Sequence, residues 1–364
     1  MEQGVDRLWE GTEMDIGQMF ILGFDGTGID DGHRIVRALE EEHLGGVILF
    51  DRNVDGSVQN ILSSGQLQDL TATLQGFSRD LLLISVDQEG GRVCRLKERD
   101  GFPKIPSAKV IGQGNLSQAA GYAGVLAATL ARHGINFNLA PVVDLDLNPD
   151  NPIIGRYQRS FGADPEQVIC NARIVIDAHH RQGVACCLKH FPGHGSAAAD
   201  SHLGFVDSTR YWHRQELIPF GRLIGEGFCD AVMTAHVINR KLDPQGLPAT
   251  LSPAIIGGCL RRALGFSGVT VTDDLQMQAI TRKWGYAEAV RLAVLAGVDL
   301  LIVGNNLERR EDALGVGRQS IKDMLDRGEV DADYIDGCLQ RIAILKKKIA
   351  GELPWNNSIP ITLS

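Results

Sequence analysis

The sequence predicts an α/β protein, a single-domain (β/α)8 barrel of the TIM type that spans residues 16–352. Eight short apolar runs alternate with longer stretches that carry helical periodicity. Near-continuous apolar runs of this length are typical of strands buried on both faces of a parallel sheet. No stretch rich in Pro, Gly and Ser divides the 364 residues, so one barrel is a better account of the chain than two domains of average size.

The expected strands are, in order, 19–23, 47–50, 82–86, 137–143, 184–188, 231–233, 269–271 and 300–303. Helices are clearest over 117–133, with Ser117 as the N-cap and Gly134 as the stop, and over 164–181. Residues 1–15 form a polar N-terminal extension and 353–364 a C-terminal tail. An open doubly wound sheet is the alternative fold, but no GxGxxG pattern follows the first strand and no P-loop occurs.

Composition and charge exclude several classes of partner. The net charge of −9 and the isoelectric point of about 5.6 argue against a surface for nucleic acid or anionic membrane. The only basic run, 346–348, is expected at the solvated end of the last helix. Seven cysteines without a CxxC pair predict reduced core residues. No signal peptide or membrane span is indicated, so we expect a cytoplasmic protein. We also expect a monomer.

Polar residues follow every expected strand. In a parallel barrel all carboxyl ends of the strands open onto one face, where active sites are built. These residues are Asp25, Asp51, Asp87 with Glu89, Asp144, Lys189 with His190, His236, Asp273 with Asp274, and Asn305. Loops are also polar for reasons unrelated to function, but the whole set favours an acidic pocket.

The segment KHFPGHG, residues 189–195, is followed by Asp200 and His202. Its prolines, glycines and alanines predict a flexible loop, which prevents two histidines from binding a metal on one helix face. No HxH pair occurs either, so we expect no metal. Asp200 and His202 are one residue apart, and a carboxylate beside an imidazole makes a proton carrier that works near neutrality. An exposed Asp and His without partners is the alternative interpretation.

Two further segments could carry chemistry. In VTDDLQM, Asp273 lies at the end of a buried strand beside Asp274, a position suited to covalent attack on an electrophilic carbon or to capping of a helix. In VDQEGGRVCR, the paired glycines allow the backbone to approach a ligand, while Asp87 and Arg95 offer an acceptor and a fork of donors. A salt-bridged loop is the alternative for this second segment.

Taken together, several strings resemble the β-N-acetylhexosaminidases of glycoside hydrolase family 3, in their NagZ-like cytoplasmic group that processes muropeptides. The strings are KHFPGHG, ADSH, VTDDLQM, VDQEGGRV, RSFG and APVVDLDLNP. The resemblance runs in order from about Gly17 to Leu345. It implies a barrel without cofactor that removes β-linked N-acetylglucosamine from N-acetylmuramic acid, or its anhydro form, in small fragments of the cell wall.

The resemblance also implies roles for individual residues. Asp273 matches the family nucleophile, and Asp200 with His202 matches the acid/base dyad. The residues that match binders of the sugar hydroxyls and acetamido group are Asp87, Arg95, Arg159, Lys189 and His190, and His236 in MTAHV is given a supporting pocket role. The chain departs from the family pattern at Ser196, where many relatives carry Asp, and at 156–158, where the segment before RSF is longer than usual.

These roles predict a retaining double displacement. His202, oriented by Asp200, protonates the leaving group while Asp273 forms a glycosyl-enzyme, and His202 then deprotonates water. A histidine acid/base also permits phosphate to replace water, which would make the enzyme a phosphorylase. Two other possibilities are a Schiff-base aldolase that uses Lys189 and a barrel that binds amino sugars without cleaving them. The aglycone preference depends on loop shape and is not encoded in the motifs.

Overall fold

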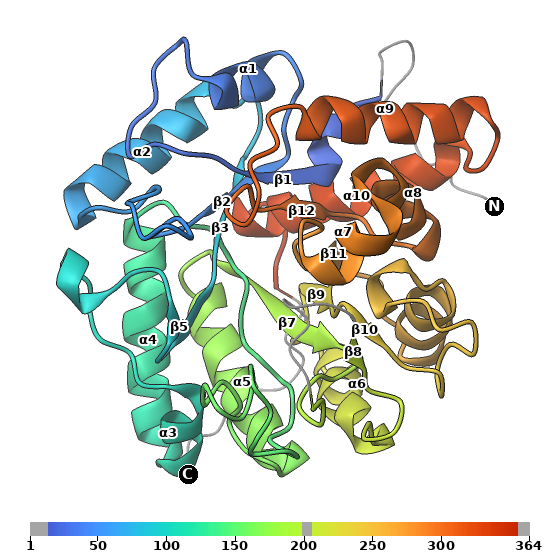
Figure 1. The fold of residues 1–364 in the computed structure, drawn as a ribbon. Coiled ribbons are helices and arrows are strands. Elements are labelled where there is room, and N and C mark those ends of the chain that lie inside the picture. The colour runs from blue at the N-terminus through green and yellow to red at the C-terminus, as the bar shows by residue number, and fades with distance from the viewer. Residues whose placement is uncertain (1–13, 199–205, 356–364) are drawn as a thin grey trace, which may run out of the picture.

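The computed structural model describes residues 14–198 and 206–355. Eight parallel strands form one sheet, surrounded by helices (Figure 1). In chain order these strands are β1 (Phe20–Gly23), β2 (Gly46–Leu49), β3 (Leu83–Val86), β6 (Phe137–Asn138), β7 (Ala185–Phe191), β9 (Ala231–Thr234), β11 (Val269–Thr272) and β12 (Leu301–Val303). Each lies within or beside one of the eight predicted runs, so the predicted barrel is confirmed.

The sheet closes on itself between its last two strands. β1 pairs with both β2 and β12, and the order continues through β3, β6, β7 and β9 to β11. A parallel bridge between Val271 and Leu300 joins β11 to the start of the β12 segment, and Thr272 N donates to Leu300 O at 2.9 Å. Closure removes the edges of the sheet, and the carboxyl ends of all eight strands therefore open at one end of the barrel.

The strand predicted over 137–143 is shorter in the structure. Only Phe137 and Asn138 pair regularly with both neighbouring strands. Pro141 follows, and proline lacks the N–H that a ladder needs. Val142 then restores contact through a bridge to Lys189.

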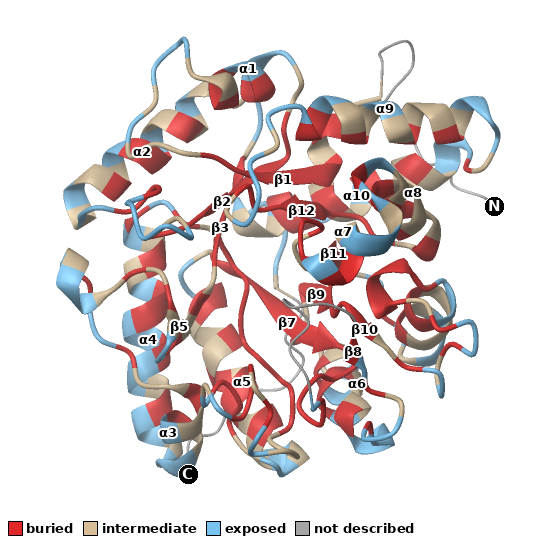
Figure 2. Cartoon of the chain, in the orientation of Figure 1, coloured by how far each residue is buried: buried red, intermediate tan, exposed pale blue. Residues whose placement is uncertain are grey.

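Ten α-helices are described, and most cover the outside of the sheet. Their bounds are α1 (Arg34–Glu40), α2 (Ser64–Phe77), α3 (Ala108–Gln113), α4 (Leu116–Arg132), α5 (Pro165–His180), α6 (Ile218–Gly225), α7 (Gln278–Trp284), α8 (Tyr286–Ala296), α9 (Ala313–Asp326) and α10 (Ala332–Ile349), and a π-helical segment spans Ala254–Ala263. Figure 2 shows their buried faces turned toward the strands.

Helix termini largely follow the sequence signals. α5 begins after Asp164, whose side chain accepts from Glu166 N as an N-cap does. α4 ends before Gly134, which has a φ of +68°. Its N-cap is Asn115 rather than the expected Ser117, because the side chains of Asn115 and Gln118 bond reciprocally to each other's backbone N–H groups.

The basic run 346–348 lies at the end of α10, as expected, but it is not wholly solvated. Lys346 is buried, and its Nζ donates to Gln18 Oε1 at 2.6 Å. Burial lowers the pKa of this lysine to about 8.

All seven cysteines are free thiols, and Cys94, Cys186, Cys187 and Cys338 are buried. None of the helices in the described part of the chain is both long and apolar enough to cross a membrane.

Two small ladders stand beside the barrel. β8 (Val206–Asp207) pairs with β10 (Val237–Ile238), and β4 (Gln88–Gly90) forms a hairpin with β5 (Val93–Cys94) directly after β3. Gly90 and Gly91, whose backbone was expected to approach a ligand, bring this hairpin against residues 105–107. A Cβ on Gly90 would lie 2.3 Å from Pro106 O, and one on Gly91 would lie 2.7 Å from Ser107 Cβ. The hairpin is therefore held firmly over the barrel mouth.

Candidate active site

A pocket of about 350 Å³ lies at the carboxyl ends of the strands. Strand residues such as Ile48, Met233 and Ile302 contribute apolar lining. Six of the nine predicted site residues line it together: Asp87, Arg95, Arg159, Lys189, His190 and Asp273. The predicted polar pocket at this face is therefore present in the fold.

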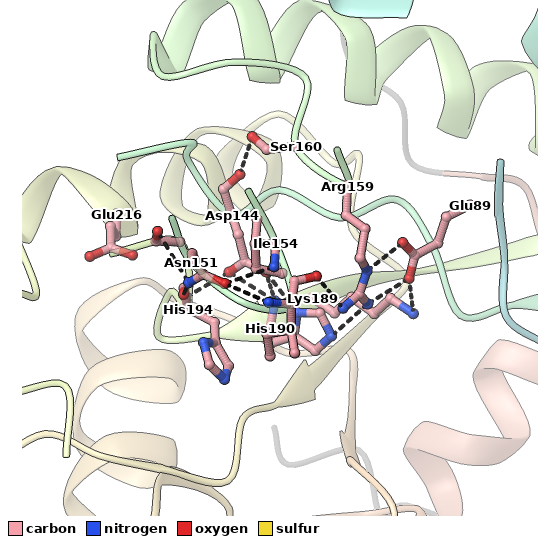
Figure 3. Close-up of polar contacts among 12 residues, drawn as sticks. Glu89, Asp144, Asn151, Ile154, Arg159, Ser160, Lys189, His190, His194 and Glu216 are labelled. Carbon is pink, nitrogen blue, oxygen red and sulfur yellow. Dashed lines mark hydrogen bonds and ion pairs between the residues drawn. The ribbon is translucent and has the colours of Figure 1, made fainter. Parts of the chain in front are cut away.

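Lys189 lies at the centre of a buried charge network. Its Nζ is 2.7 Å from Asp87 Oδ1 and 2.7 Å from Glu89 Oε1. Arg159 donates to both oxygens of Glu89, from Nε at 2.8 Å and from NH2 at 2.7 Å (Figure 3). Two cations thus face two carboxylates, as buried charges require. Glu89 was not among the predicted site residues, although it follows the same strand as Asp87.

The network keeps all its members ionised. Burial opposes ionisation of Glu89, but the facing Arg159 and Lys189 outweigh it and lower the pKa of this carboxyl to about 2. Burial likewise opposes the charge on Lys189, yet Asp87 and Glu89 raise the pKa of its amine. The amine is therefore a protonated hydrogen-bond donor at neutral pH.

Arg95 extends the network toward Asp51. Its NH2 is 3.5 Å from Asp87 Oδ2, and its NH1 is 4.0 Å from Asp51 Oδ1. Asp51 is buried at the end of β2 and also binds Lys97 at 2.6 Å and Arg99 at 3.0 Å. Asp51 therefore anchors the segment that follows the β4–β5 hairpin, a role that its position after a strand did not reveal.

Asp144 holds two histidines of the KHFPGHG segment. This fully buried carboxylate accepts from His190 Nδ1 at 2.7 Å, from His190 N at 3.1 Å and from His194 N at 2.8 Å (Figure 3). The bond to Nδ1 turns the Nε2 edge of His190 toward Arg159 NH2, 3.3 Å away. Asp144 was noted only as one of several acids after strands, and its partners lie about 46 to 50 residues further along the chain.

The described part of the loop after His190 is anchored, in contrast to the flexible segment expected from Gly193 onward. Residues 192–197 are buried. Asn151 Nδ2 donates to His194 O at 2.8 Å and to Ala197 O at 2.9 Å. Ser196 Oγ donates to Glu216 Oε1 at 2.6 Å. Serine at this position thus has a buried carboxyl as its partner, and burial raises the pKa of that carboxyl to about 7.

Asp200 and His202 lie outside the described residues, so their roles as the acid/base dyad remain predictions. The chain before and after them is described. Ala197 and Val206 belong to one small buried apolar cluster with Ala235 and Val237. Both ends of the intervening segment are therefore fixed near the carboxyl end of β9.

The two acids after β11 have different surroundings, although both line the pocket. Asp274 Oδ1 accepts from Gln276 N at 3.0 Å and from Gly304 N at 3.1 Å, which ties the ends of β11 and β12 together. Asp273 Oδ1 accepts from Asp274 N at 2.8 Å. The N-cap of α7 is Met277, so neither acid caps this helix, as one alternative had it. Asp274 therefore has a structural role in joining the ends of β11 and β12.

His236 contacts the turn that contains Asp273 and Asp274. Its Nε2 lies 2.9 Å from Asp274 O, and its Nδ1 lies 2.8 Å from Thr250 Oγ1. His236 is buried and is not one of the pocket-lining residues. Its contacts tie it to the Asp273–Asp274 turn, and its supporting role in the pocket stays a prediction.

Comparisons with known proteins identify the family of this chain. The family model described as the glycosyl hydrolase family 3 N-terminal domain matches residues 12–345. A β-hexosaminidase from Tolumonas auensis is 39% identical over 294 residues, which cover 79% of this chain and 82% of the relative. A β-hexosaminidase from Pseudomonas aeruginosa is 36% identical over 326 residues, or 86% and 92% of the two chains.

Solved structures of β-N-acetylhexosaminidases and β-N-acetylglucosaminidases are also similar to this chain. A β-N-acetylhexosaminidase from Beutenbergia cavernae superposes with a TM-score of 0.81 at 28% identity, covering 91% of this chain and 97% of that one. A family 3 β-N-acetylglucosaminidase from Paenibacillus sp. gives a TM-score of 0.83 at 35% identity, but its match to 96% of this chain spans only 64% of its own length. The chain therefore belongs to glycosyl hydrolase family 3 and is a glycoside hydrolase related to the β-hexosaminidases.

Proposed function

We propose that the protein is a retaining exo-β-N-acetylglucosaminidase that cleaves terminal N-acetylglucosamine from muropeptides derived from peptidoglycan, in the cytoplasm and as a monomer. One observation carries the proposal: the Asp273 carboxylate shares its pocket with Asp87, Lys189 and Arg159. A carboxylate nucleophile beside a dense set of fixed donors and acceptors is what hydrolysis of a neutral sugar requires.

The charge network suits a neutral amino sugar. Sugar hydroxyls both donate and accept hydrogen bonds, and here the carboxylate of Asp87 can accept while Lys189 and Arg95 can donate. Because the cations and anions face one another, the site offers strong hydrogen bonds without a large excess of either charge.

The reaction follows from these positions together with the predicted dyad. Asp273 attacks the anomeric carbon and forms a C–O bond, while the bond to the leaving oxygen breaks and His202 transfers its proton to that oxygen. Water then gives a proton to His202 and attacks the same carbon, which releases Asp273 and retains the configuration. Asp200 orients the imidazole and stabilises its charge in both steps.

The aldolase alternative fits the site poorly. A Schiff base requires a neutral amine, but Lys189 lies between two carboxylates that raise its pKa. We therefore assign Lys189 to sugar binding.

Mutation of Asp273 tests the proposal. Asp273→Ala should lower kcat for an aryl β-N-acetylglucosaminide on the order of 10³-fold or more, because the covalent step is lost. In the wild type, a slow fluorinated N-acetylglucosamine donor should add one sugar mass to the peptide that contains Asp273. Products with and without phosphate separate hydrolysis from phosphorolysis.

Asp274→Asn is the matched control for the labelling experiment, since Asp274 is adjacent and should not carry the sugar. Near-wild-type turnover by Asp273→Ala, or a label found on Asp274, would show that the nucleophile is misassigned.

A further inference from the structure

Arg92 and Tyr157 lie together at the mouth of the pocket. The Arg92 guanidinium carbon is 3.9 Å from the centre of the Tyr157 ring, and Tyr157 and Val93 line the pocket itself. We propose that this pair is a binding site for a carboxylate on the leaving group of the substrate. The proposal rests on the proposed function and deepens it, because it assigns residues to recognition of the aglycone.

Arg92 differs from the cations inside the pocket. Lys189, Arg159 and Arg95 each contact at least one carboxylate of the protein. Arg92 is exposed, and no carboxylate of the residues described lies within 4.0 Å of it. Its guanidinium rests on the Tyr157 ring, which leaves the planar edge of N–H donors available to an incoming anion.

Residues 105–109 hold both members of the pair in position, through the neighbours Gly91 and Gln158. Gly91 N donates to Ile105 O at 2.9 Å, and the close approach of Gly91 to Ser107 leaves no room for a side chain there. On the other side, Gln158 Oε1 accepts from Ser107 Oγ at 2.9 Å and Gln158 O accepts from Lys109 N at 3.2 Å. Arg92 and Tyr157 thus meet on a common support, which reduces the ordering cost of binding.

The turn at 156–158 gives Tyr157 this place. Gln158 adopts a φ of +57°, a left-handed conformation that is uncommon outside glycine. That turn lies between Tyr157, which lines the pocket, and Arg159, which binds Glu89 inside it. This turn therefore supplies an aromatic wall to the mouth, and Arg159 remains on its ion pair with Glu89.

Substrate chemistry selects a carboxylate as the ligand. An exo-acting enzyme holds the terminal sugar at the closed end of its pocket, so an exposed cation at the mouth faces the leaving group. N-acetylmuramic acid differs from N-acetylglucosamine by a lactyl ether that ends in a carboxylate, and stem peptides carry further carboxylates. The protein has a net charge of −9, so an anionic ligand needs a local cation to offset general repulsion.

Kinetics of paired disaccharides test this site. Wild type and Arg92→Gln are compared by kcat/KM on GlcNAc-β-1,4-MurNAc, which has a free lactyl carboxylate, and on chitobiose, which is a neutral disaccharide of similar size. Arg92→Gln should lower the ratio of kcat/KM on GlcNAc-MurNAc to kcat/KM on chitobiose about five- to tenfold. The change should come mainly from a higher KM for the anionic substrate, because an arginine–carboxylate pair is lost. Arg92→Lys should retain part of the preference, and Tyr157→Leu should lose part of it.

Arg327→Gln removes a positive charge from an exposed residue after α9 that does not line the pocket, and its ratio should equal that of the wild type. A GlcNAc-MurNAc-peptide, in which the lactyl carboxylate is an amide, separates the lactyl group from the stem peptide as the source of the anion. An equal loss on both disaccharides in Arg92→Gln, or no change in the ratio, would overturn the carboxylate site. Wild type that cleaves chitobiose but not GlcNAc-MurNAc would overturn the proposed substrate instead.

Discussion

At the scale of single residues, the charge network of the pocket has two consequences, one for binding and one for stability. Glu89 pairs with both Arg159 and Lys189 in a place from which water is largely excluded, and Asp87 is the second carboxylate beside Lys189. A buried ion pair contributes little net stability over an apolar pair of the same shape. Removing one partner is different, because it leaves a charge buried without compensation.

Glu89→Gln should therefore lower the free energy of unfolding by about 3 to 5 kcal/mol. The matched control is Glu41→Gln, since Glu41 pairs with Arg37 on the exposed face of α1 at 2.9 Å, where such pairs contribute about 0 to 1 kcal/mol. Urea unfolding of both variants gives the comparison. A similar loss of unfolding free energy in the two variants would contradict the view that Glu89 compensates buried positive charge.

Glu216 makes stability depend on pH. Burial raises its pKa to about 7 from an ordinary value of 4.5, so the folded protein holds a proton on Glu216 that the unfolded chain releases. The resulting stabilisation is complete below about pH 4.5 and is lost as pH rises through about 7. A shift of this size corresponds to about 3 kcal/mol.

Glu216→Gln should remove this component, so its stability should decline less between pH 4.5 and 7 than that of the wild type. Denaturant unfolding at a series of pH values measures the difference. Glu352→Gln, at an exposed carboxyl near the end of the described chain, is the control and should follow the wild-type curve. Parallel curves for wild type and Glu216→Gln would show that Glu216 titrates normally.

At the scale of elements, close approach decides where glycine is required. Gly112 in α3 has no room for a side chain, because a Cβ there would lie 2.0 Å from Phe161 O. Gly121 in α4 is exposed and has nothing within 4 Å of the same position. The two glycines are alike in helical context and differ in packing, so they form a matched pair.

Gly112→Ala should destabilise the protein by about 1 to 3 kcal/mol through overpacking. Gly121→Ala should stabilise it by about 0.5 to 1 kcal/mol, since alanine is the better helix former. Thermal and urea unfolding of both variants provide the measurement. Stabilisation by Gly112→Ala would mean that α3 does not pack against the segment around Phe161.

At the scale of the whole molecule, the closed sheet and one large buried cluster make the barrel a single cooperative unit. We therefore expect one unfolding transition. N-acetylglucosamine at one hundred times its Kd should raise the free energy of unfolding by about 2.7 kcal/mol and move that whole transition. Calorimetry with and without the sugar checks this, with Lys189→Met as the variant that should lose the shift. Two transitions, only one of them shifted by the sugar, would indicate two domains.

The sequence alone predicted the barrel, its strands and most of the pocket. Apolar runs, caps and motif strings are local patterns, and the carboxyl ends of parallel strands must meet at one face. The sequence did not predict which charged residues of the pocket pair with each other. Lys189 and Asp87 are 102 residues apart, and Arg159 and Glu89 are 70 apart. Only the tertiary structure decides which distant charges face each other, because burial and pairing depend on how the closed sheet brings separate loops together. The proposed roles of Asp144, Glu216 and the Arg92–Tyr157 pair depend likewise on contacts between distant parts of the chain.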